Sequence, residues 1–160
     1  MFQVMEALKG GDLQKYMSKR NKSGDYLTER EVRIIMRQIL EAVKYMHVQG
    51  GIMHRDLKPE NILLKDCSSD HICVKIADFG LACQKNSHDL MGRHTLSVGT
   101  KLYMAPEMFF EKNYTQKVDM WAIGCIMFNL LFQGERPFYN SGEGVNKFVE
   151  RLGKEKLHFD

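Results

Sequence analysis

The chain has 160 residues, 44% of them hydrophobic and 27% charged, which is typical of one soluble globular domain. Its formal net charge of +3 is too small to favour nucleic acid as a partner. The longest apolar stretch, 122–132, is interrupted by Gly124 and Asn129 and is too short to cross a bilayer, so we expect no membrane partner.

The cysteine pattern indicates the compartment. Cys67, Cys73, Cys83 and Cys125 form no C-x-x-C pair, so a zinc site is not expected. The first eight residues are too short and too poor in apolar side chains for the core of a secretion signal. Scattered thiols without such a signal favour a reducing environment. We therefore expect an intracellular, cytoplasmic protein, with a nuclear location left open.

The first predicted elements are a strand-like piece at residues 2–8 and a glycine turn at 9–11. A short helix is predicted to begin at Asp12, because Leu13, Tyr16 and Met17 have the i, i+3, i+4 spacing of one helical face. Thr28 and Glu31 match a capping box and predict the start of a long helix that ends at residues 50–51. Its apolar stripe consists of Val32, Ile35, Met36, Ile39, Val43 and Met46.

Two strands and two helices are predicted farther along the chain. A buried strand at 62–64 pairs with the alternating Ile72, Val74 and Ile76 across a turn at 66–70. A long polar loop follows at 81–104, and loops of that length are usually functional. Apolar blocks predict a helix at 117–133 and a weaker one at 145–152.

The most specific pattern is the run from His54 to Asn61, which reads H-R-D-L-K-P-E-N and is followed 17 residues later by Asp78-Phe79-Gly80. These segments resemble the catalytic loop, H-R-D-L-x-x-x-N, and the metal-binding D-F-G of eukaryotic-type protein kinases. A lone Asp on a loop is more often a cap or turn residue, but an ordered set of such residues favours catalysis. The resemblance implies a kinase that uses ATP and Mg²⁺.

Phosphoryl transfer needs positioning and charge neutralisation more than covalent help. Asp56 would accept the proton of the substrate hydroxyl, and Lys58 would place a positive charge beside the transferred group. Asn61 and Asp78 offer the oxygen ligands that Mg²⁺ prefers. Asp119 resembles the buried Asp that organises the catalytic loop of kinases, and we expect it to accept backbone N–H groups.

Two segments resemble serine/threonine kinases rather than tyrosine kinases. The run from Asp56 to Asn61 is typical of the former, whereas tyrosine kinases usually carry alanine and arginine there. The run from Gly99 to Glu107 resembles G-T-x-x-Y-x-A-P-E, the segment that receives the residue after the phosphoacceptor. This implies that Thr100 hydrogen-bonds to Asp56 and Lys58, and that the substrate is a protein serine or threonine.

The segment from Met5 to Leu8 resembles the kinase hinge, which implies nucleotide contacts near the start of the chain. The backbone groups of Glu6 and Leu8 would bond to the adenine edge, and Asp12 would bind the ribose. Leu13 and Leu63 would sandwich the adenine, although either residue alone would be read as an ordinary core leucine.

Arg55 resembles the arginine of kinases that are switched by phosphorylation of the activation loop. A phosphate there could pair with its guanidinium and order the loop. The nearest hydroxyls are those of Thr95 and Ser97, each of which is either a regulatory site or a solvated surface side chain. The resemblance also implies an upstream activating kinase as a partner.

The segments 2–13 and 134–138 look most like the calcium/calmodulin-dependent kinase group. Asp12 and Glu60 could then bind an arginine upstream of the phosphoacceptor, as in basophilic members of the group. Asn129, however, stands where many strongly basophilic kinases carry an acid. A preference for basic substrate residues is a hypothesis at this point.

The chain contains no glycine-rich loop, no V-A-I-K-type lysine and no glutamate partner for it. We expect residues 1–160 to be a partial kinase domain, truncated at both ends. It would be mainly α-helical with short β-hairpins, the C-terminal lobe of the kinase-like α+β fold with the N-terminal lobe absent. Two functions remain open: a serine/threonine kinase that we expect to be inactive as this isolated chain, or a non-catalytic binding module or decoy for substrates or a full-length kinase. The intact motifs favour the first.

Overall fold

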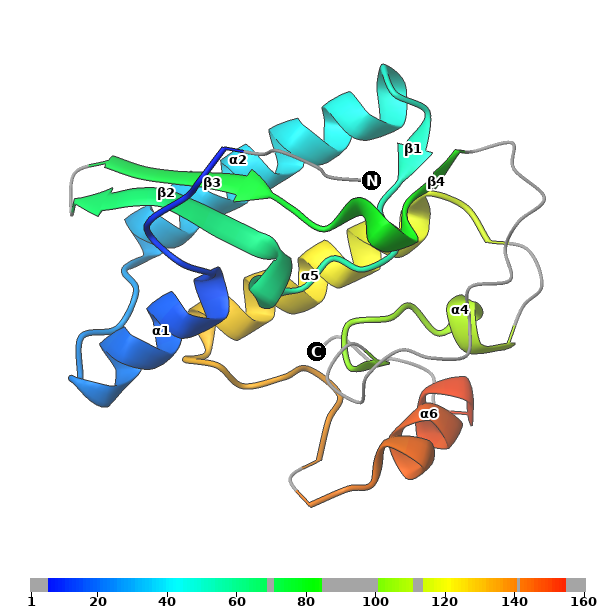
Figure 1. Cartoon of the computed structure of the whole chain (residues 1–160). Helices are drawn as coiled ribbons and strands as arrows, with labels where there is room; N and C mark the ends of the chain where they lie inside the picture. Colours follow the sequence, from blue (N-terminus) through cyan, green and yellow to red (C-terminus); the bar gives the residue numbers. More distant parts are fainter. Residues whose placement is uncertain (1–5, 69–70, 85–100, 111–113, 141, 155–160) are drawn as a thin grey trace.

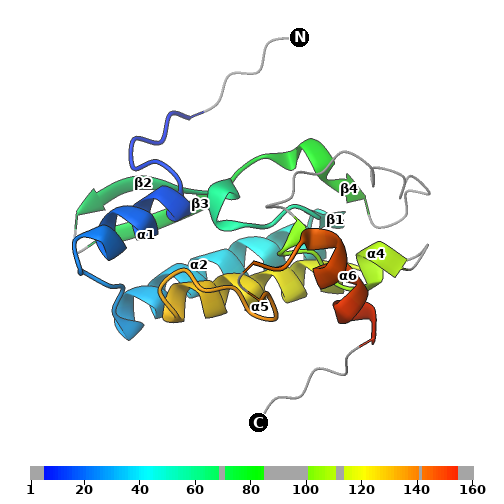
Figure 2. The same ribbon diagram turned by 90° about the horizontal axis from the view of Figure 1, so that it is seen from below.

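The computed structural model describes residues 6–68, 71–84, 101–110, 114–140 and 142–154. The helices there are α1 (Leu13–Lys22), α2 (Glu29–Val48), α4 (Glu107–Phe110), α5 (Lys117–Leu131) and α6 (Val145–Lys154). The strands are β1 (Ile52–Met53), β2 (Ile62–Ser68), β3 (His71–Ile76) and β4 (Cys83–Gln84), and short 3-10 turns occupy Pro59–Asn61 and Phe79–Leu81. Helix α2 packs against both α5 and β3 (Figures 1 and 2).

Helix α1 begins directly after Asp12, as predicted. The Asp12 Oδ1 atom accepts a hydrogen bond from the Lys15 backbone N–H at 2.8 Å, which satisfies one of the unpaired donors of the first turn. Leu13 and Met17 are buried, and Tyr16 packs beside them against the core. The predicted apolar face of this helix is therefore confirmed.

Helix α2 confirms both its predicted cap and its predicted stripe. The Thr28 hydroxyl accepts from the Glu31 N–H at 3.3 Å, and the Glu31 carboxylate accepts from the Thr28 N–H at 2.8 Å. All six residues of the predicted stripe are buried. The guanidinium of Arg20 on α1 binds the carboxylates of Glu31 and Asp25, so the start of α2 is tied to the end of α1.

Strands β2 and β3 form an antiparallel hairpin in which Leu64 faces Val74. The outer edge of β2 is covered by the preceding chain, because Gly10 N–H donates to Leu64 O at 3.0 Å and Leu64 N–H donates to Gly11 O at 2.8 Å. A Cβ atom on Gly10 would lie 2.7 Å from Leu64 O, so this close approach requires glycine.

The outer edge of β3 is covered by a side chain instead of a strand. Gln38 on α2 donates from Nε2 to Ile72 O at 2.9 Å and accepts at Oε1 from the Val74 N–H at 3.0 Å. Its amide thus makes the two bonds that a neighbouring strand would make. Open strand edges invite pairing with other chains, and both edges of this hairpin are protected.

The predicted turn at 66–70 was too long. Strand β2 continues to Ser68 and β3 begins at His71, with a register shift between Leu64 and Cys67. A bulge of this kind inserts an unpaired residue and breaks the alternation of side chains. The strand therefore continues past the point where its sequence pattern stops.

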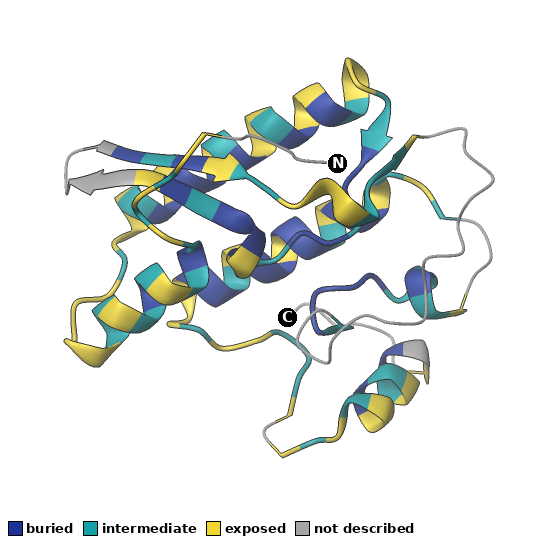
Figure 3. Ribbon diagram, in the orientation of Figure 1, coloured by how far each residue is buried: buried dark blue, intermediate teal, exposed yellow. Residues whose placement is uncertain are grey.

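Helix α5 is apolar around most of its circumference, which is typical of a helix inside a core. Its buried residues line much of its length (Figure 3). Two buried residues on it are polar, Asp119 and Asn129. Asn129 donates from Nδ2 to Glu135 O at 2.9 Å, and this bond holds the turn that ends the helix. The helix stops at Leu131, two residues before the predicted end.

The predicted polar loop at 81–104 is only partly a surface loop. Leu102, Tyr103 and Met104 are buried, and burial raises the pKa of Tyr103 to about 12. Residues 85–100 lie outside the described part of the chain. The last helix, α6, buries Phe148 and Leu152, as its spacing predicts.

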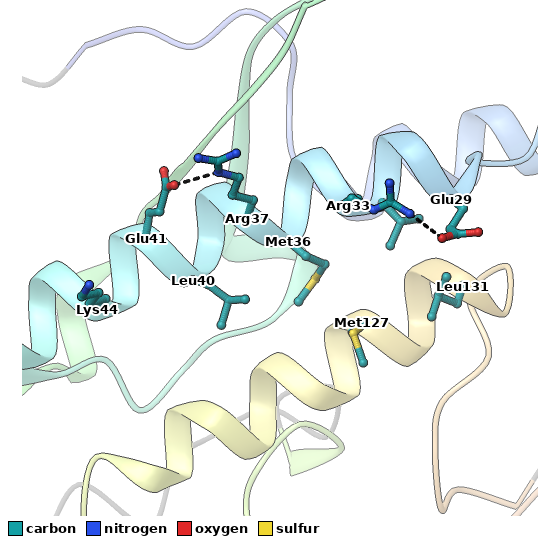
Figure 4. A pocket seen from close by; sticks show the side chains of 10 residues that line it. Glu29, Arg33, Met36, Arg37, Leu40, Glu41, Lys44, Met127 and Leu131 are labelled. Carbon is teal, nitrogen blue, oxygen red and sulfur yellow. Dashed lines mark hydrogen bonds and ion pairs between the residues drawn. The ribbon is translucent and has the colours of Figure 1, made fainter.

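A groove of about 500 Å³ lies between α2 and α5 (Figure 4). Met36, Leu40, Met127 and Leu131 give it apolar walls. The ion pairs Glu29–Arg33 and Arg37–Glu41 run along α2 beside it. No residue of the run from His54 to Asn61 lines this groove. Among the described helices, none combines the length and apolar character needed to span a membrane.

Candidate active site

Two short strands bracket the motif residues. Strand β1 ends at Met53, directly before His54, and β4 begins at Cys83, shortly after Gly80. The strands pair antiparallel, with Met53 opposite Cys83. Sequence analysis did not predict this sheet, because strands of two residues carry no period. Their pairing brings the start of the first motif close to the end of the second.

Asp119, in the first turn of α5, holds the start of the catalytic loop. Its Oδ2 atom accepts from the His54 N–H at 2.9 Å, and its Oδ1 atom accepts from the Arg55 N–H at 2.9 Å. Asp119 is 1% exposed. Arg55 has φ of 67°, a left-handed conformation that costs a non-glycine residue energy. The carboxylate makes the backbone contacts that were predicted for it.

Asp56 is buried, with 7% of its surface exposed. Its Oδ2 atom accepts from Lys58 Nζ at 3.0 Å and from Asn61 Nδ2 at 3.0 Å. Asn61 Nδ2 also donates to the backbone oxygen of Asp56 at 2.8 Å. Within the described residues, Asp56 Oδ1 has no hydrogen-bond partner. One carboxylate oxygen is therefore fixed in place while the other can accept a proton.

Ala77 connects the two motifs through its backbone. Its N–H donates to Asn61 O at 2.9 Å, and its carbonyl oxygen lies 3.1 Å from His54 Nε2. Asp78 follows with φ of 63°, and its Oδ1 atom accepts from the Gly80 N–H at 3.2 Å. These bonds fix the backbone before Asp78 relative to Asn61. Sequence reasoning missed Ala77 because a backbone contact leaves no signal in the residue type.

The partners of His54 define its protonation state. Its Nδ1 atom accepts from the Asp56 N–H at 3.3 Å, and its Nε2 atom faces Ala77 O, so the ring proton belongs on Nε2. The ring is fully buried and lies 5.0 Å from the Phe79 ring. Burial lowers the pKa of His54, although its backbone partner and nearby acids oppose that shift. The neutral imidazole thus bridges the two motifs.

Arg55 joins the catalytic loop to two other segments. Its Nε atom donates to Leu81 O, and its Nη1 atom donates to the Tyr114 hydroxyl at 3.4 Å. Thr95, Ser97 and Thr100 lie outside the described residues. The roles of these three residues in regulation and catalysis stay predictions.

Glu6, Leu8 and Asp12, which were predicted to contact a nucleotide, lie before α1; Leu13 is the first residue of α1, and Leu63 lies on β2. Asp12 and Leu63 face each other in a β-bridge; Leu13 is fully buried and Leu63 is partly exposed. Leu8 is partly exposed. Glu6 forms ion pairs with lysines of β2 and β3, and the hydrogen bond from Lys75 is the main cause of its lowered pKa. Their nucleotide contacts stay predictions.

Asn61 and Asp78 fit a magnesium site chemically. Asn61 uses its amide nitrogen to bond Asp56, so its side-chain oxygen is left to act as a ligand. Asp78 is exposed and offers a carboxylate. In the part of the chain that is described, no group of three or more His, Cys, Asp or Glu side chains could hold a metal. Mg²⁺ commonly takes one or two protein ligands and completes its shell with phosphates and water.

Comparison with known protein families identifies the family to which this chain belongs. The model of the protein kinase domain matches residues 1–157. The chain belongs to the protein kinase domain family. The catalytic roles of Asp56, Lys58, Asn61 and Asp78 within that domain stay predictions.

Three relatives illustrate the similarity. The chain is 38% identical over 165 residues to serine/threonine-protein kinase 33 of Mus musculus, covering 100% of this chain and 32% of the relative. It is 40% identical over 157 residues to serine/threonine-protein kinase atg1 of Dictyostelium discoideum, covering 98% and 22%. It is 39% identical over 160 residues to calcium/calmodulin-dependent protein kinase type 1 of Macrobrachium nipponense, covering 100% and 43%. The chain thus spans less than half of each relative.

The family match corrects the fold class drawn from the sequence. We expected a C-terminal lobe with the N-terminal lobe absent, but the match assigns residues 1–157 to the protein kinase domain as such. The expectation rested on motifs that the chain lacks, and a missing motif does not locate the boundary of a lobe. The supported description is a protein-kinase-like fold.

Proposed function

We propose that this chain carries the phosphoryl-transfer site of an ATP- and Mg²⁺-dependent protein serine/threonine kinase. One observation supports the proposal most strongly: the buried carboxylate of Asp56 has Oδ2 fixed by two donors and Oδ1 without a partner among the described residues. A capping or structural Asp would use both oxygens, since buried polar atoms are nearly always bonded. An oxygen left available in a buried carboxylate fits a base.

The side chains act on the substrate hydroxyl and on the transferred group. Asp56 Oδ1 would accept the hydroxyl proton as the hydroxyl oxygen bonds to the γ-phosphorus of ATP, and the bond from that phosphorus to the bridging oxygen would break to release ADP. Lys58 Nζ, bonded to the other oxygen, keeps a positive charge beside the reacting atoms and stabilises the charge that develops there. Magnesium held by Asn61 and Asp78 would neutralise the phosphate oxygens. The hydrogen bond from Asn61 to Asp56 fixes the position of this metal ligand relative to the base.

Substrate preference is the finer part of the proposal. Asp12 is already engaged by the Lys15 side chain at 2.8 Å, whereas Glu60 is exposed on the turn between Lys58 and Asn61. An upstream basic residue would therefore be bound mainly by Glu60. The identities of 38%, 40% and 39% to three differently named kinases do not single out the calcium/calmodulin-dependent group, so that assignment stays a prediction.

The test is phosphate transfer by the native polypeptide that carries residues 1–160. Peptides with Ser, Thr or Tyr as acceptor, each with Arg or Ala upstream, are incubated with radiolabelled ATP, with Mg²⁺ or with excess EDTA. We expect labelling of Ser and Thr peptides, better with Arg, and none with EDTA. Transfer that persists in EDTA, or that favours Tyr, would contradict the proposed function. Equal labelling of Arg and Ala peptides would remove the basic preference alone.

A further inference from the structure

Glu6 joins the segment before α1 to the β2–β3 hairpin through its side chain. Its carboxylate forms an ion pair with Lys75 of β3, and its Oε1 atom lies 3.7 Å from Lys65 Nζ of β2. One carboxylate thus binds a lysine from each strand of the hairpin. Sequence analysis missed this contact because Glu6 and Lys75 are 69 positions apart.

The two lysines share a face of the hairpin with Leu63. Successive side chains of a strand point to opposite faces. Leu64 is buried, whereas Leu63 is partly exposed and Lys65 is exposed, so these two residues lie on the outer face. Lys75 is the register partner of Leu63, and partners across an antiparallel pair share a face. Glu6 therefore binds the hairpin beside Leu63, which is predicted to contact adenine.

The side chain of Glu6 anchors a part of the segment that backbone bonds do not reach. Among the described residues, the backbone hydrogen bonds between this segment and β2 begin at Lys9, whose N–H donates to Lys65 O at 3.2 Å. Residues 6–8, whose backbone is predicted to bond to the adenine edge, come before that point. The ion pairs of Glu6 therefore help to set the distance between this backbone and Leu63.

We propose that Glu6 is a positioning residue for nucleotide binding, acting through its ion pairs with Lys75 and Lys65 on the backbone of residues 6–8. The inference rests on the proposed function for its effect on ATP, whereas the anchoring of the segment can be measured without activity. An ion pair that only stabilises the fold would leave the KM for ATP unchanged. A positioning pair raises this KM when it is broken and leaves kcat unchanged, because it acts on binding alone.

The exposure of the three side chains sets the size of the expected effect. Glu6, Lys75 and Lys65 are 47%, 46% and 57% exposed, so dissolved salt screens their ion pairs. We expect Lys75→Met and Glu6→Gln each to raise the KM for ATP about threefold at low salt, as for loss of an exposed ion pair. The ratio of the variant KM to the wild-type KM should approach one at high salt.

Charge-conserving and charge-reversing variants separate the role of charge from that of packing. Lys75→Arg keeps the positive charge and should keep the wild-type KM for ATP. Glu6→Lys repels Lys75 and should raise the KM further, and the added Lys75→Glu change should recover part of the loss. Lys44→Met, which removes an exposed lysine of α2, is the matched control and should behave as the wild type. All variants are made in the native polypeptide.

Hydrogen exchange measures the anchoring directly. The amides of Lys9 and Gly10 donate to the backbone of β2, directly after the residues that Glu6 holds. We expect these two amides to exchange about threefold faster in Glu6→Gln than in the wild type. The amides of Ile39 and Ile126, in the cores of α2 and α5, should exchange at the same rate in both proteins.

The outcomes distinguish this inference from the proposed function. An unchanged KM for ATP in Lys75→Met and Glu6→Gln would overturn the inference, and so would a lower kcat with no change in KM. Unchanged exchange at Lys9 and Gly10 would overturn the anchoring. A wild-type protein without kinase activity would refute the proposed function, and the exchange rates would then decide whether Glu6 anchors the segment.

Discussion

At the scale of single residues, the two buried aspartates of the site, Asp119 and Asp56, differ in how many of their carboxylate oxygens accept hydrogen bonds. Asp119 is bonded at both oxygens and holds the backbone of the catalytic loop. Asp56 is bonded at one oxygen, so the other can accept a proton. His54 lies between them as a neutral ring that bonds to the amide of Asp56. The hydrogen bonds of Asp119 fit a structural role, and those of Asp56 fit the reactive role that we propose for it.

The buried His54 predicts how stability depends on pH. Burial lowers its pKa below the usual 6.5, so the unfolded chain binds a proton that the folded chain does not. Stability should therefore be full above pH 6.5 and should fall as pH decreases from there toward the lowered pKa. His54→Phe removes this titrating group and also two hydrogen bonds, so the free energy of unfolding at pH 8 should fall by about 1–3 kcal/mol.

Urea unfolding of both proteins between pH 8 and pH 5 checks this expectation. The difference in free energy of unfolding between the wild type and His54→Phe should become smaller as the pH falls, because only the wild type loses the stabilising contribution of the neutral His54. The other five histidines are common to both proteins and cancel in the comparison. A difference in free energy of unfolding that stays constant over this range would contradict a neutral, buried His54.

At the scale of elements, α2 organises most of the described structure. Its first turn is capped by Thr28, and its buried stripe packs in the core. Gln38 closes the edge of β3, and His47 reaches Asp119. One helix thus supports the hairpin on its middle turns and the catalytic loop at its end.

Gln38 supplies the prediction at this scale. Gln38→Leu should leave Ile72 O and the Val74 N–H without their partner. The free energy of unfolding should therefore fall by about 1–3 kcal/mol for each of these groups that water does not reach. The substitution should also promote self-association, because the edge of β3 becomes available for strand pairing. Chemical denaturation and sedimentation velocity measure the two effects. Gln49→Leu, at the exposed C-cap of α2, is the control, and equal behaviour of both variants would contradict the role of Gln38.

The sequence predicted the helices better than the strands. The stripe of α2 and the face of α6 follow from apolar periodicity, because a face of three or more turns repeats the same signal. Helix α5 was predicted instead from an apolar block of helical length. The β1–β4 sheet has only two residues per strand, and β2 contains a bulge, so neither offers a period to read. The buried residues Leu102, Tyr103 and Met104 were predicted to be loop because their burial comes from packing in the core and not from a repeating pattern: Leu102 and Tyr103 lie in the main core, and Met104 packs with Met108 of α4 and Val118 of α5.

At the scale of the whole molecule, the site forms where distant segments converge. The catalytic loop follows α2 and β1, Asp78 follows β3, and Asp119 comes from α5. Motif spacing identified Asp56, Lys58, Asn61 and Asp78 as candidates. It could not identify His47, Gln38 or Ala77, because their contacts join positions 16 to 72 residues apart. Local motifs therefore point to the candidate reactive residues, whereas the residues that hold them in place can be found only from the folded structure.

The most direct test of the central claim is the rate of phosphate transfer by Asp56→Asn. The native polypeptide, in wild-type and variant form, is measured at saturating Mg²⁺, ATP and peptide, with Glu150→Gln, an exposed carboxylate on α6, as control. The structure predicts a rate lower by about 10²–10⁴ with KM for ATP little changed, as for loss of a general base. A variant that keeps a rate close to that of the wild type would contradict Asp56 as the base.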